Sequence, residues 1–470
     1  MPDFSTIIQS PDIRALVQEN ILERAFHDAL FPRLMFRGEA SPVLWPANVG
    51  DSMVFTGTGL IKPKLRPVQP GSDPAPSTFS AEQWSAQLQQ YSDSIDTHMP
   101  TSIVAIANLF LRNAQQLGLS SGQTLNRVVR DRLYNAALSG WTVADGAQNA
   151  VTTLRVKRLN GFTRARRPDL PAGSPVKFDT VSANNPLKIK LLDTTGAPAE
   201  VSRTVTGYTP DTAGDEIGPG TLTLTGGAVT VASRAYVFAE DCTGIVRVGG
   251  GNKVDDVTGT DILRLADVRA AVARFWQQNV PEYGDGYFHC HLDPVSQAQI
   301  FSDPEFQRLL TSLPDYFIYR QFALGALLGT VFFRNSECPL SDTVEGGSTA
   351  TFTLDDPFAG ELFNTGATTG VKIHRALFVG QGALHEYHQD LSALITDAGI
   401  TGKVGEPRIS NNGIEVNTDR VQLIIRAPLN RLQDLVSTSW KFVGDWPVRT
   451  DVSSGDAARY KRVLAIEHGE

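Results

Sequence analysis

The stretch LADVRAAVARFWQQNVPEYGDGYFHCHLDP, residues 265–294, carries the most informative pattern in this chain of 470 residues. Its first half places apolar residues at helical spacing: Leu265, Val268, Ala271, Val272 and Phe275. Residues 287–292 then form a short apolar run between turn signals, which is typical of a buried strand. A helix that leads through a turn into a buried strand indicates mixed structure, and we expect an α+β fold.

Two segments before this stretch have too few apolar residues to form a core of their own. Residues 11–31 predict an amphipathic helix that Pro32 ends, and Phe26 and Leu30 lie on its apolar stripe. Residues 49–96 predict two strands around a proline-rich tip, whose five prolines between positions 63 and 76 exclude a helix. That tip carries the basic residues Lys62, Lys64 and Arg66. Both segments therefore need a partner surface.

The middle of the chain changes from helix to strand. Residues 101–117 and 121–138 predict two helices, with Gly118 as the stop between them. Residues 143–258 contain short β-prone runs separated by Gly, Pro and Asp turns, at 187–192, 221–225 and 235–238. We interpret residues 150–256 as an inserted all-β domain with a glycine-rich exit at 249–252. Two further strands are expected at 439–443 and 460–466.

Composition narrows the possible functions. The chain is 41% hydrophobic and 20% charged, which argues against general disorder, and it has no run of 18 apolar residues. The lack of such a run predicts no membrane span, and the first residues show no signal-peptide pattern; we expect no membrane among the partners. Three widely spaced cysteines form no disulfide framework. A net charge of −8 limits any contact with nucleic acid to local patches.

Signatures of enzymes are weak throughout. His289 and His291 share one face of a predicted strand, as two ligands of one metal ion would, but a second ligand pair is missing. Cys290 points to the opposite face, so His289 cannot act as its base. His385 and His388 around Glu386 do not have the spacing of a zinc protease. We therefore expect no enzyme, no catalytic residue, no metal and no cofactor. A metal-dependent enzyme built on His289 and His291 is the outside alternative.

A basic window interrupts the acidic chain. Six basic residues lie between positions 155 and 167: Arg155, Lys157, Arg158, Arg164, Arg166 and Arg167. Such a run can contact phosphate, but it more often forms a solvated face or pairs with acidic neighbours. In a chain of net negative charge we favour pairing between subunits.

Several motifs in order suggest a family. The segment 265–294 resembles a helix followed by a Gly-Tyr-apolar strand in the major capsid proteins of tailed phages with the Hong Kong 97-type fold. FALGALLGTVFFRN at 322–335 and LFVGQGA at 377–383 resemble later segments of that family. SWKF at 439–442 and RVLAIE at 462–467 resemble its closing strands. The likeness covers roughly the outer three-quarters of the chain and leaves the β-rich middle unexplained.

The resemblance implies a division of the chain into seven parts. They are the N-terminal arm 1–48, extended loop 49–96, peripheral domain with spine helices 97–149, inserted β domain 150–256, peripheral helix 257–284, axial domain 285–430 and closing peripheral strands 431–470. It also implies assembly in the host cytoplasm and a place in the virion capsid.

The same resemblance implies the partners. They are other copies of the chain in hexamers and pentamers, a scaffolding protein, a portal, a cement protein in some cases, and double-stranded DNA bound weakly on the inner face. An encapsulin-like protein compartment and a tail tube or sheath protein remain alternatives.

Overall fold

The structure is a computed structural model of the whole chain. It describes residues 35–46, 50–58, 81–98, 109–166, 178–192, 200–233, 235–239, 245–251, 256–312, 325–335, 337–338, 362–363, 371–389, 408–410, 413–418, 420–426, 435–449 and 462–470, with a few more between 63 and 77. The predicted helix at 11–31 lies outside these residues. Within them, no helix is long and apolar enough to cross a membrane.

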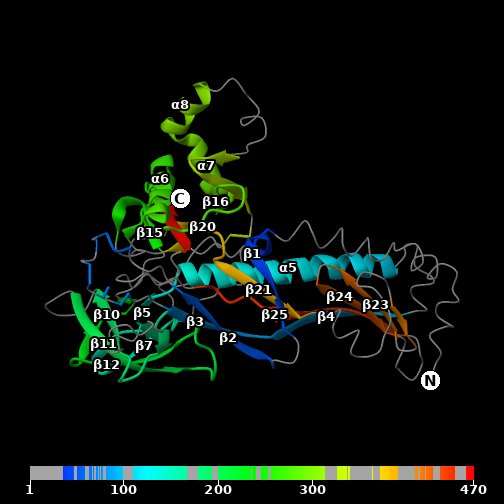
Figure 1. The fold of residues 1–470 in the computed structure, drawn as a ribbon, viewed down its shortest axis with the longest axis horizontal. Coiled ribbons are helices and arrows are strands. Elements are labelled where there is room, and N and C mark those ends of the chain that lie inside the picture. The colour runs from blue at the N-terminus through cyan, green and yellow to red at the C-terminus, as the bar shows by residue number, and fades with distance from the viewer. Residues whose placement is uncertain are drawn as a thin grey trace. The chain divides into compact units, whose positions relative to one another are not determined.

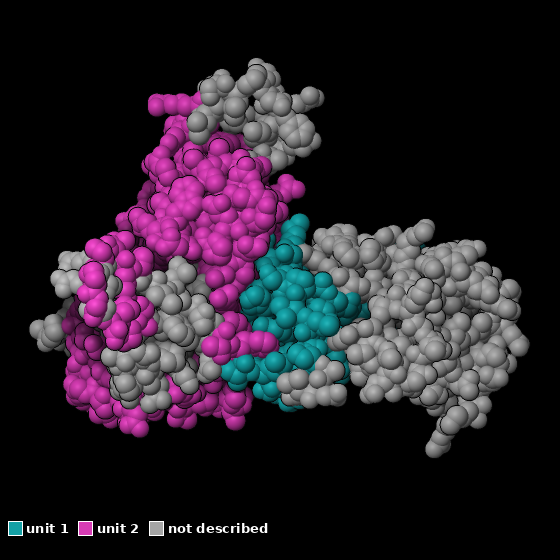
Figure 2. Space-filling model, in the orientation of Figure 1, with its two compact units in different colours: residues 1–54, 85–130, 384–447 teal, residues 55–84, 131–383, 448–470 magenta. Residues whose placement is uncertain are grey.

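The chain divides into two compact units, each built from separate stretches of sequence (Figure 2). Unit 1 contains residues 1–54, 85–130 and 384–447. Unit 2 contains residues 55–84, 131–383 and 448–470. Both units therefore depend on long-range pairing of segments.

Unit 1 holds a seven-stranded sheet. Its strands are β1 (Ala40–Trp45), β4 (Gln89–His98), β21 (Leu384–Gln389), β22 (Arg408–Ser410), β23 (Gly413–Thr418), β24 (Val421–Arg426) and β25 (Leu435–Asp445). Strand β25 confirms the strand expected at 439–443, and β4 pairs antiparallel along nearly all of it. Alternate β25 side chains are buried, as for a sheet with one face on a core. The short 3-10 turn η2 (Arg37–Glu39) leads into β1.

One long helix, α5 (Leu109–Ala137), replaces the two helices predicted here (Figure 1). The expected break at Gly118 is wrong, because the helix continues through that residue. Ala114, Leu117 and Leu125 on either side of Gly118 are buried, so one apolar face runs past it. A glycine inside a helix costs only about 1 kcal/mol, which this burial outweighs. The Ser121 hydroxyl also donates to the Gly118 carbonyl oxygen.

The proline-rich segment is flanked by two strands, as the sequence predicts. Strands β2 (Ser52–Thr58) and β3 (Ala81–Gln87) form a two-stranded sheet of their own. Phe55 and Trp84 stack with ring centroids 6.2 Å apart, which fixes the pairing. Among the described side chains of these two strands, only Ala86 is buried. A two-stranded sheet with so little buried apolar surface has little stability of its own.

Unit 2 contains a second seven-stranded sheet, together with the helix-to-strand segment of residues 265–294. The sheet consists of β15 (Ile245–Arg247), β16 (Phe288–Leu292), β17 (Ala326–Leu327), β18 (Thr330–Arg334), β19 (Leu362–Phe363), β20 (Val371–Val379) and β26 (Val463–Gly469). Helices α6 (Leu265–Gln277), α7 (Pro294–Ser302) and α8 (Pro304–Ser312) belong to this part, with the short turn η3 (Val248–Gly250). Helix α6 and strand β16 confirm the prediction for residues 265–292. The five apolar residues predicted for α6 are buried in the structure.

The β-rich middle of the chain forms a six-stranded antiparallel sheet in unit 2. Its order is β5 (Trp141–Val143), β14 (Tyr236–Ala239), β10 (Leu187–Leu192), β11 (Glu200–Pro210), β12 (Gly220–Thr225) and β7 (Thr153–Val156). A bridge between Ala144 and Val156, with the Lys157 amide donating to the Val143 carbonyl at 3.0 Å, joins the last strand to the first. The sheet therefore closes into a barrel. Two short pairs accompany it: β6 (Gln148–Val151) with β13 (Val229–Val231), and β8 (Arg164–Arg166) with β9 (Phe178–Thr180).

The barrel differs from the expected limits of the β domain at both ends. Its first strand begins at Trp141, before residue 150, because β5 pairs with β14 far along the chain. Residues 245–247 lie beyond it, since β15 pairs in parallel with β26 in the other sheet. Strand pairing at long range, which local sequence patterns do not show, decides both limits.

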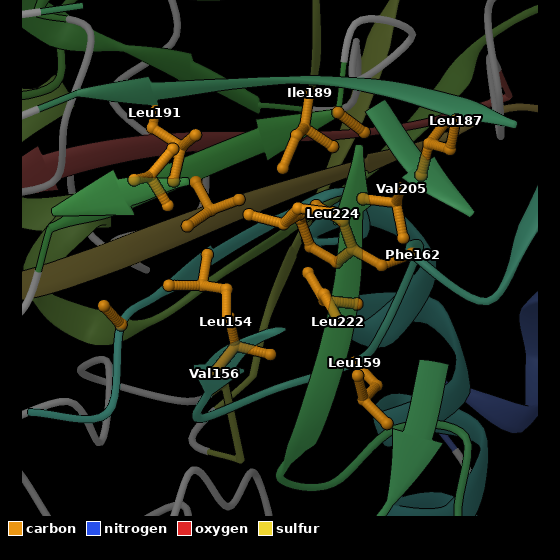
Figure 3. Close-up of a cluster of buried hydrophobic side chains, with 14 of the residues drawn as sticks. Leu154, Val156, Leu159, Phe162, Leu187, Ile189, Leu191, Val205, Leu222 and Leu224 are labelled. Carbon is orange, nitrogen blue, oxygen red and sulfur yellow. The ribbon is translucent and has the colours of Figure 1, made fainter. Parts of the chain in front are cut away.

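Apolar side chains fill the barrel (Figure 3). Leu154, Leu222 and Ile189 come from three different strands and point toward one another. On β12, Leu222 and Leu224 are buried whereas Thr223 and Thr225 are exposed, which is the alternation of a strand with one wet face. The three β-runs predicted at 187–192, 221–225 and 235–238 correspond to β10, β12 and β14.

We expect Leu222→Ala to lower the free energy of unfolding of the barrel by about 2–5 kcal/mol, because it leaves a cavity in a closed core. The neighbouring exposed change Thr223→Ala is the matched control, and its effect should be within about 0.5 kcal/mol. Urea denaturation followed by hydrogen exchange in β10 and β12 measures both. Equal effects of the two changes would contradict this account of the core.

Candidate functional site

The predicted contact residues fall into two groups. Phe26, Leu30, Lys62, Arg66 and Arg167 lie outside the described residues, as does the side chain of Arg166 in β8. Lys64 is described and exposed, beside Pro63 and Leu65. Arg155, Lys157, Arg158 and Arg164 all belong to the barrel region.

The basic window is largely engaged within its own subunit. Arg155 pairs with Asp145 at 2.9 Å and with Asp211 at 2.7 Å. Arg164 lies 3.9 Å from Glu216. The acidic partners expected on another subunit are, for these two residues, supplied by the same barrel.

Arg158 is a correction to the predicted contact set. Its side chain is almost completely buried, and its guanidinium donates to the side-chain oxygen of Asn135. Its backbone amide donates to the Thr142 hydroxyl at 3.1 Å. A side chain enclosed by its own subunit is not available to a neighbour, so the structure argues against Arg158 as an inter-subunit contact.

The hairpin tip presents apolar surface to solvent. Leu65 is 90% exposed and stands between Pro63 and Pro67, and Val54 on β2 is 62% exposed. Prolines limit the backbone freedom of the tip, so little conformational entropy is lost when it binds a surface. Burying a leucine side chain contributes about 1.5–3 kcal/mol. The tip is therefore well suited to dock on another surface.

A buried carboxylate fastens the start of β1 within unit 1. Arg37 donates two hydrogen bonds of 2.8 Å to the two carboxylate oxygens of Glu386. Arg420 donates to the same carboxylate at 2.7 Å, and the Trp446 indole N–H does so at 3.3 Å. The guanidinium of Arg37 also lies over the Phe442 ring, 5.3 Å from its centroid. Segments from three parts of the chain meet at Glu386.

The charge on Glu386 is stabilised by these partners. Burial opposes the charge, but the hydrogen bonds and charges of Arg37 and Arg420 outweigh it and lower the pKa of Glu386 to about 2 from its ordinary 4.5. Sequence reasoning noticed Glu386 only as a neighbour of His385 and His388 in a possible metal cluster. Its true partner, Arg37, is 349 positions away, and no local pattern signals that pair.

The two histidines of the outside alternative are both engaged by aromatic rings. His289 stacks on Tyr283 with centroids 3.8 Å apart, and His291 is buried against Phe333. Both rings contact Phe333, so they share one face of β16 as predicted. Cys290 is buried on the other side among apolar residues, and burial raises the pKa of its thiol. Among the described residues, no three His, Cys, Asp or Glu side chains are placed to hold a metal ion.

Unit 2 contains a second buried polar cluster, which no pattern in the sequence predicted. Asp293 caps α7 and accepts a hydrogen bond from the backbone amide of Ser296. Asp293 also contacts Nδ1 of His374 at 2.7 Å, and Ser296 contacts Nε2 of His468 at 2.7 Å. The Ser296 hydroxyl donates to Asp293 as well. The hydrogen bonds from His374 and Ser296 overcome burial and lower the pKa of Asp293.

This cluster has the residue types of a serine hydrolase but not its arrangement. In a catalytic triad the acid orients the histidine that activates the serine. Here Asp293 contacts His374, whereas Ser296 contacts His468. Ser296 and both imidazoles are fully buried, so no substrate reaches the hydroxyl. The cluster is therefore structural within unit 2.

Comparison with known proteins finds similar solved structures but no similar sequence. No family model matches the chain, and no curated protein matches it in sequence. Several solved bacteriophage capsid structures are similar to it over most of its length.

Three of these structures illustrate the range of sequence identity and TM-score. The capsid of Ralstonia phage GP4 has 13% identity and a TM-score of 0.44, covering 90% of this chain and 84% of that one. The capsid of cyanophage Pam1 has 9% identity and a TM-score of 0.49, covering 94% and 92%. The acidic stable capsid of Helicobacter pylori bacteriophage KHP30 has 7% identity and a TM-score of 0.41, covering 93% and 91%.

Proposed function

We propose that this chain is the major capsid protein of a tailed bacteriophage, with the Hong Kong 97-type fold and an inserted β domain. In this proposal it assembles as hexamers and pentamers into an icosahedral shell around double-stranded DNA. Its role is structural rather than catalytic. The virion capsid is its location, after assembly in the host cytoplasm.

The observation that carries the proposal is the hairpin of β2 and β3. Among its described residues, the hairpin pairs only with itself, buries only the side chain of Ala86 and holds Leu65 almost fully in solvent. Shell subunits need surfaces that become complementary only in the assembly, because closed symmetry repeats the same contact between all copies. A stiff, apolar-tipped hairpin of this kind is such a surface.

The remaining partners follow from the capsid proposal. A scaffolding protein and a portal guide assembly, and a cement protein is a further partner for the outer surface. With a net charge of −8, contact with packaged DNA is weak and not sequence-specific. The expected contact residues toward neighbouring copies are Phe26, Leu30, Lys62, Lys64, Arg66, Lys157, Arg166 and Arg167. Arg155 and Arg164 are left out because their guanidinium groups pair with acidic residues of their own barrel.

Negative-stain electron microscopy of the overexpressed chain tests the proposal directly. Closed shells that contain DNA support it. Closed shells that contain protein cargo instead would indicate an encapsulin-like compartment, and helical tubes would indicate a tail tube or sheath protein. Dispersed monomers with bound metal would favour the enzyme alternative.

The basic window gives a separate prediction. The double change Lys157→Glu and Arg167→Glu should lower the yield of shells several-fold while leaving the DNA content of each surviving shell unchanged, because we expect these residues to pair with acidic groups of neighbours. Shell yield by sedimentation and DNA content by absorbance ratio measure the two effects. A normal yield of shells with reduced DNA would instead assign these residues to DNA contact.

A further inference from the structure

Two buried imidazoles lie face to face where the last described strand meets α7. His374 on β20 and His468 on β26 are paired across the two strands, and their rings stack with centroids 5.5 Å apart. Both side chains have no exposed surface. Nε2 of His468 contacts the Ser296 hydroxyl at 2.7 Å, whereas its Nδ1 is buried with no hydrogen-bond partner.

The charged groups around these rings differ for the two histidines. His374 lies between Asp293, at 2.7 Å from Nδ1, and Glu470, at 3.1 Å from Nε2, so two carboxylates face it. The His468 ring hydrogen-bonds to neither carboxylate and faces Ser296 and the His374 ring. His289 and His291 on β16 contact Phe333 on β18 instead. The Asp293 charge also acts on buried Tyr134 of α5.

A proton on His468 is therefore unfavourable in the folded state. It adds a second N–H at Nδ1 with no acceptor and places a positive charge beside His374 in a buried site. Burial first, and then the charge of His374, lower the pKa of His468 to about 3 from its ordinary 6.5. An opened state, in which the ring reaches water, takes up the proton at the ordinary value.

We infer that His468 is an acid-sensitive clasp, whose protonation opens the contacts of β26 with β20 and α7 while the barrel stays folded. The neutral ring holds the clasp closed above about pH 6.5, and its contribution is lost as the pH falls from there toward 3. Each pH unit in this window raises the opening equilibrium about tenfold. The inference does not depend on the capsid proposal.

The barrel supplies an internal reference because residues 141–239 contain no histidine. Hydrogen–deuterium exchange of the full chain, corrected for the intrinsic effect of pH, reports the opening of each part separately. Between pH 6.5 and 4.5 we expect protection of the β20 and β26 amides to fall by about 50-fold, since the open-state ring is already half protonated at pH 6.5. Protection of β10 and β12 should change little over the same range.

The variant His468→Gln tests the assignment to this residue. Glutamine keeps a donor or acceptor for Ser296 but does not titrate. For each unit by which the pH is lowered, β26 protection should therefore fall several-fold less in this variant than in the wild-type chain. His98→Gln, a change at an exposed histidine on β4 of unit 1, is the matched control and should leave the β26 profile unchanged.

Two results would overturn the clasp. One is an unchanged pH profile of β26 in a folded His468→Gln variant. The other, which the wild-type chain alone can give, is loss of β26 and barrel protection together at the same pH. The second measurement decides the question even when the variant does not fold.

Discussion

Removal of residues 60–78 is expected to give a soluble subunit that no longer forms shells. The segment contributes little to the core of its own subunit, since its described residues are exposed and Leu65 is almost fully in solvent. Its loss therefore costs the fold little. In a closed shell, however, each copy would lose the same contact, and a deficit of about 1.5–3 kcal/mol per leucine recurs at every interface.

Two further variants separate the contribution of the side chains in this segment from that of its length. Replacing residues 60–78 by a Gly/Ser-rich linker of equal length keeps the loop closed but removes its side chains and prolines, and it should also abolish shells. Leu65→Ser alone should lower shell yield without changing thermal stability of the subunit. Sedimentation and electron microscopy measure assembly, and circular dichroism measures folding. Normal shells from the deletion would refute the role assigned to the hairpin.

Replacement of Glu386 by glutamine should destabilise the unit 1 sheet by about 3–5 kcal/mol at neutral pH. The change leaves the buried Arg37 guanidinium without its carboxylate, and removing one partner of a buried ion pair is far more costly than removing an exposed one. The matched control is Glu200→Gln, which breaks the exposed pair of Glu200 with Lys190 and should cost about 1 kcal/mol or less.

The pH dependence of this effect has a definite sign. Because the pKa of Glu386 falls from 4.5 to about 2 on folding, its stabilisation is fully present above pH 4.5 and is lost as the pH falls toward 2. The loss amounts to about 3 kcal/mol. The difference in free energy of unfolding between wild type and Glu386→Gln should therefore shrink as the pH falls from 4.5 to 2. Hydrogen exchange of the β21 and β25 amides in urea measures the stability of this sheet in the two proteins. A stability difference that stays the same at all pH values would contradict the ion-pair explanation.

Local patterns in the sequence were sufficient for several elements. Helix α6 and strand β16 follow from apolar spacing within residues 265–292, because both periods repeat within a few residues. Strands β10 and β12 follow from alternation between turn signals for the same reason. The proline-rich tip followed from residue types alone, since proline restricts its own backbone wherever it occurs.

Long-range packing decided what local patterns could not. Gly118 predicts a helix end, but burial on both sides of it carries α5 through. The barrel closes because Ala144 and Val156 meet, and its limits depend on which strands β5 and β15 find as partners. The residues at the start and at the end of the barrel give no local signal of where it begins and ends.

The two buried polar networks show the same division most clearly. The sequence by itself determined which residues can carry a charge or a proton at Glu386, Arg37 and His468. Only the tertiary structure decided that Glu386 meets Arg37 across 349 positions and that His468 meets Ser296 across 172. The energy of such contacts comes from burial and from partners supplied by distant segments, so it exists only once the chain has folded.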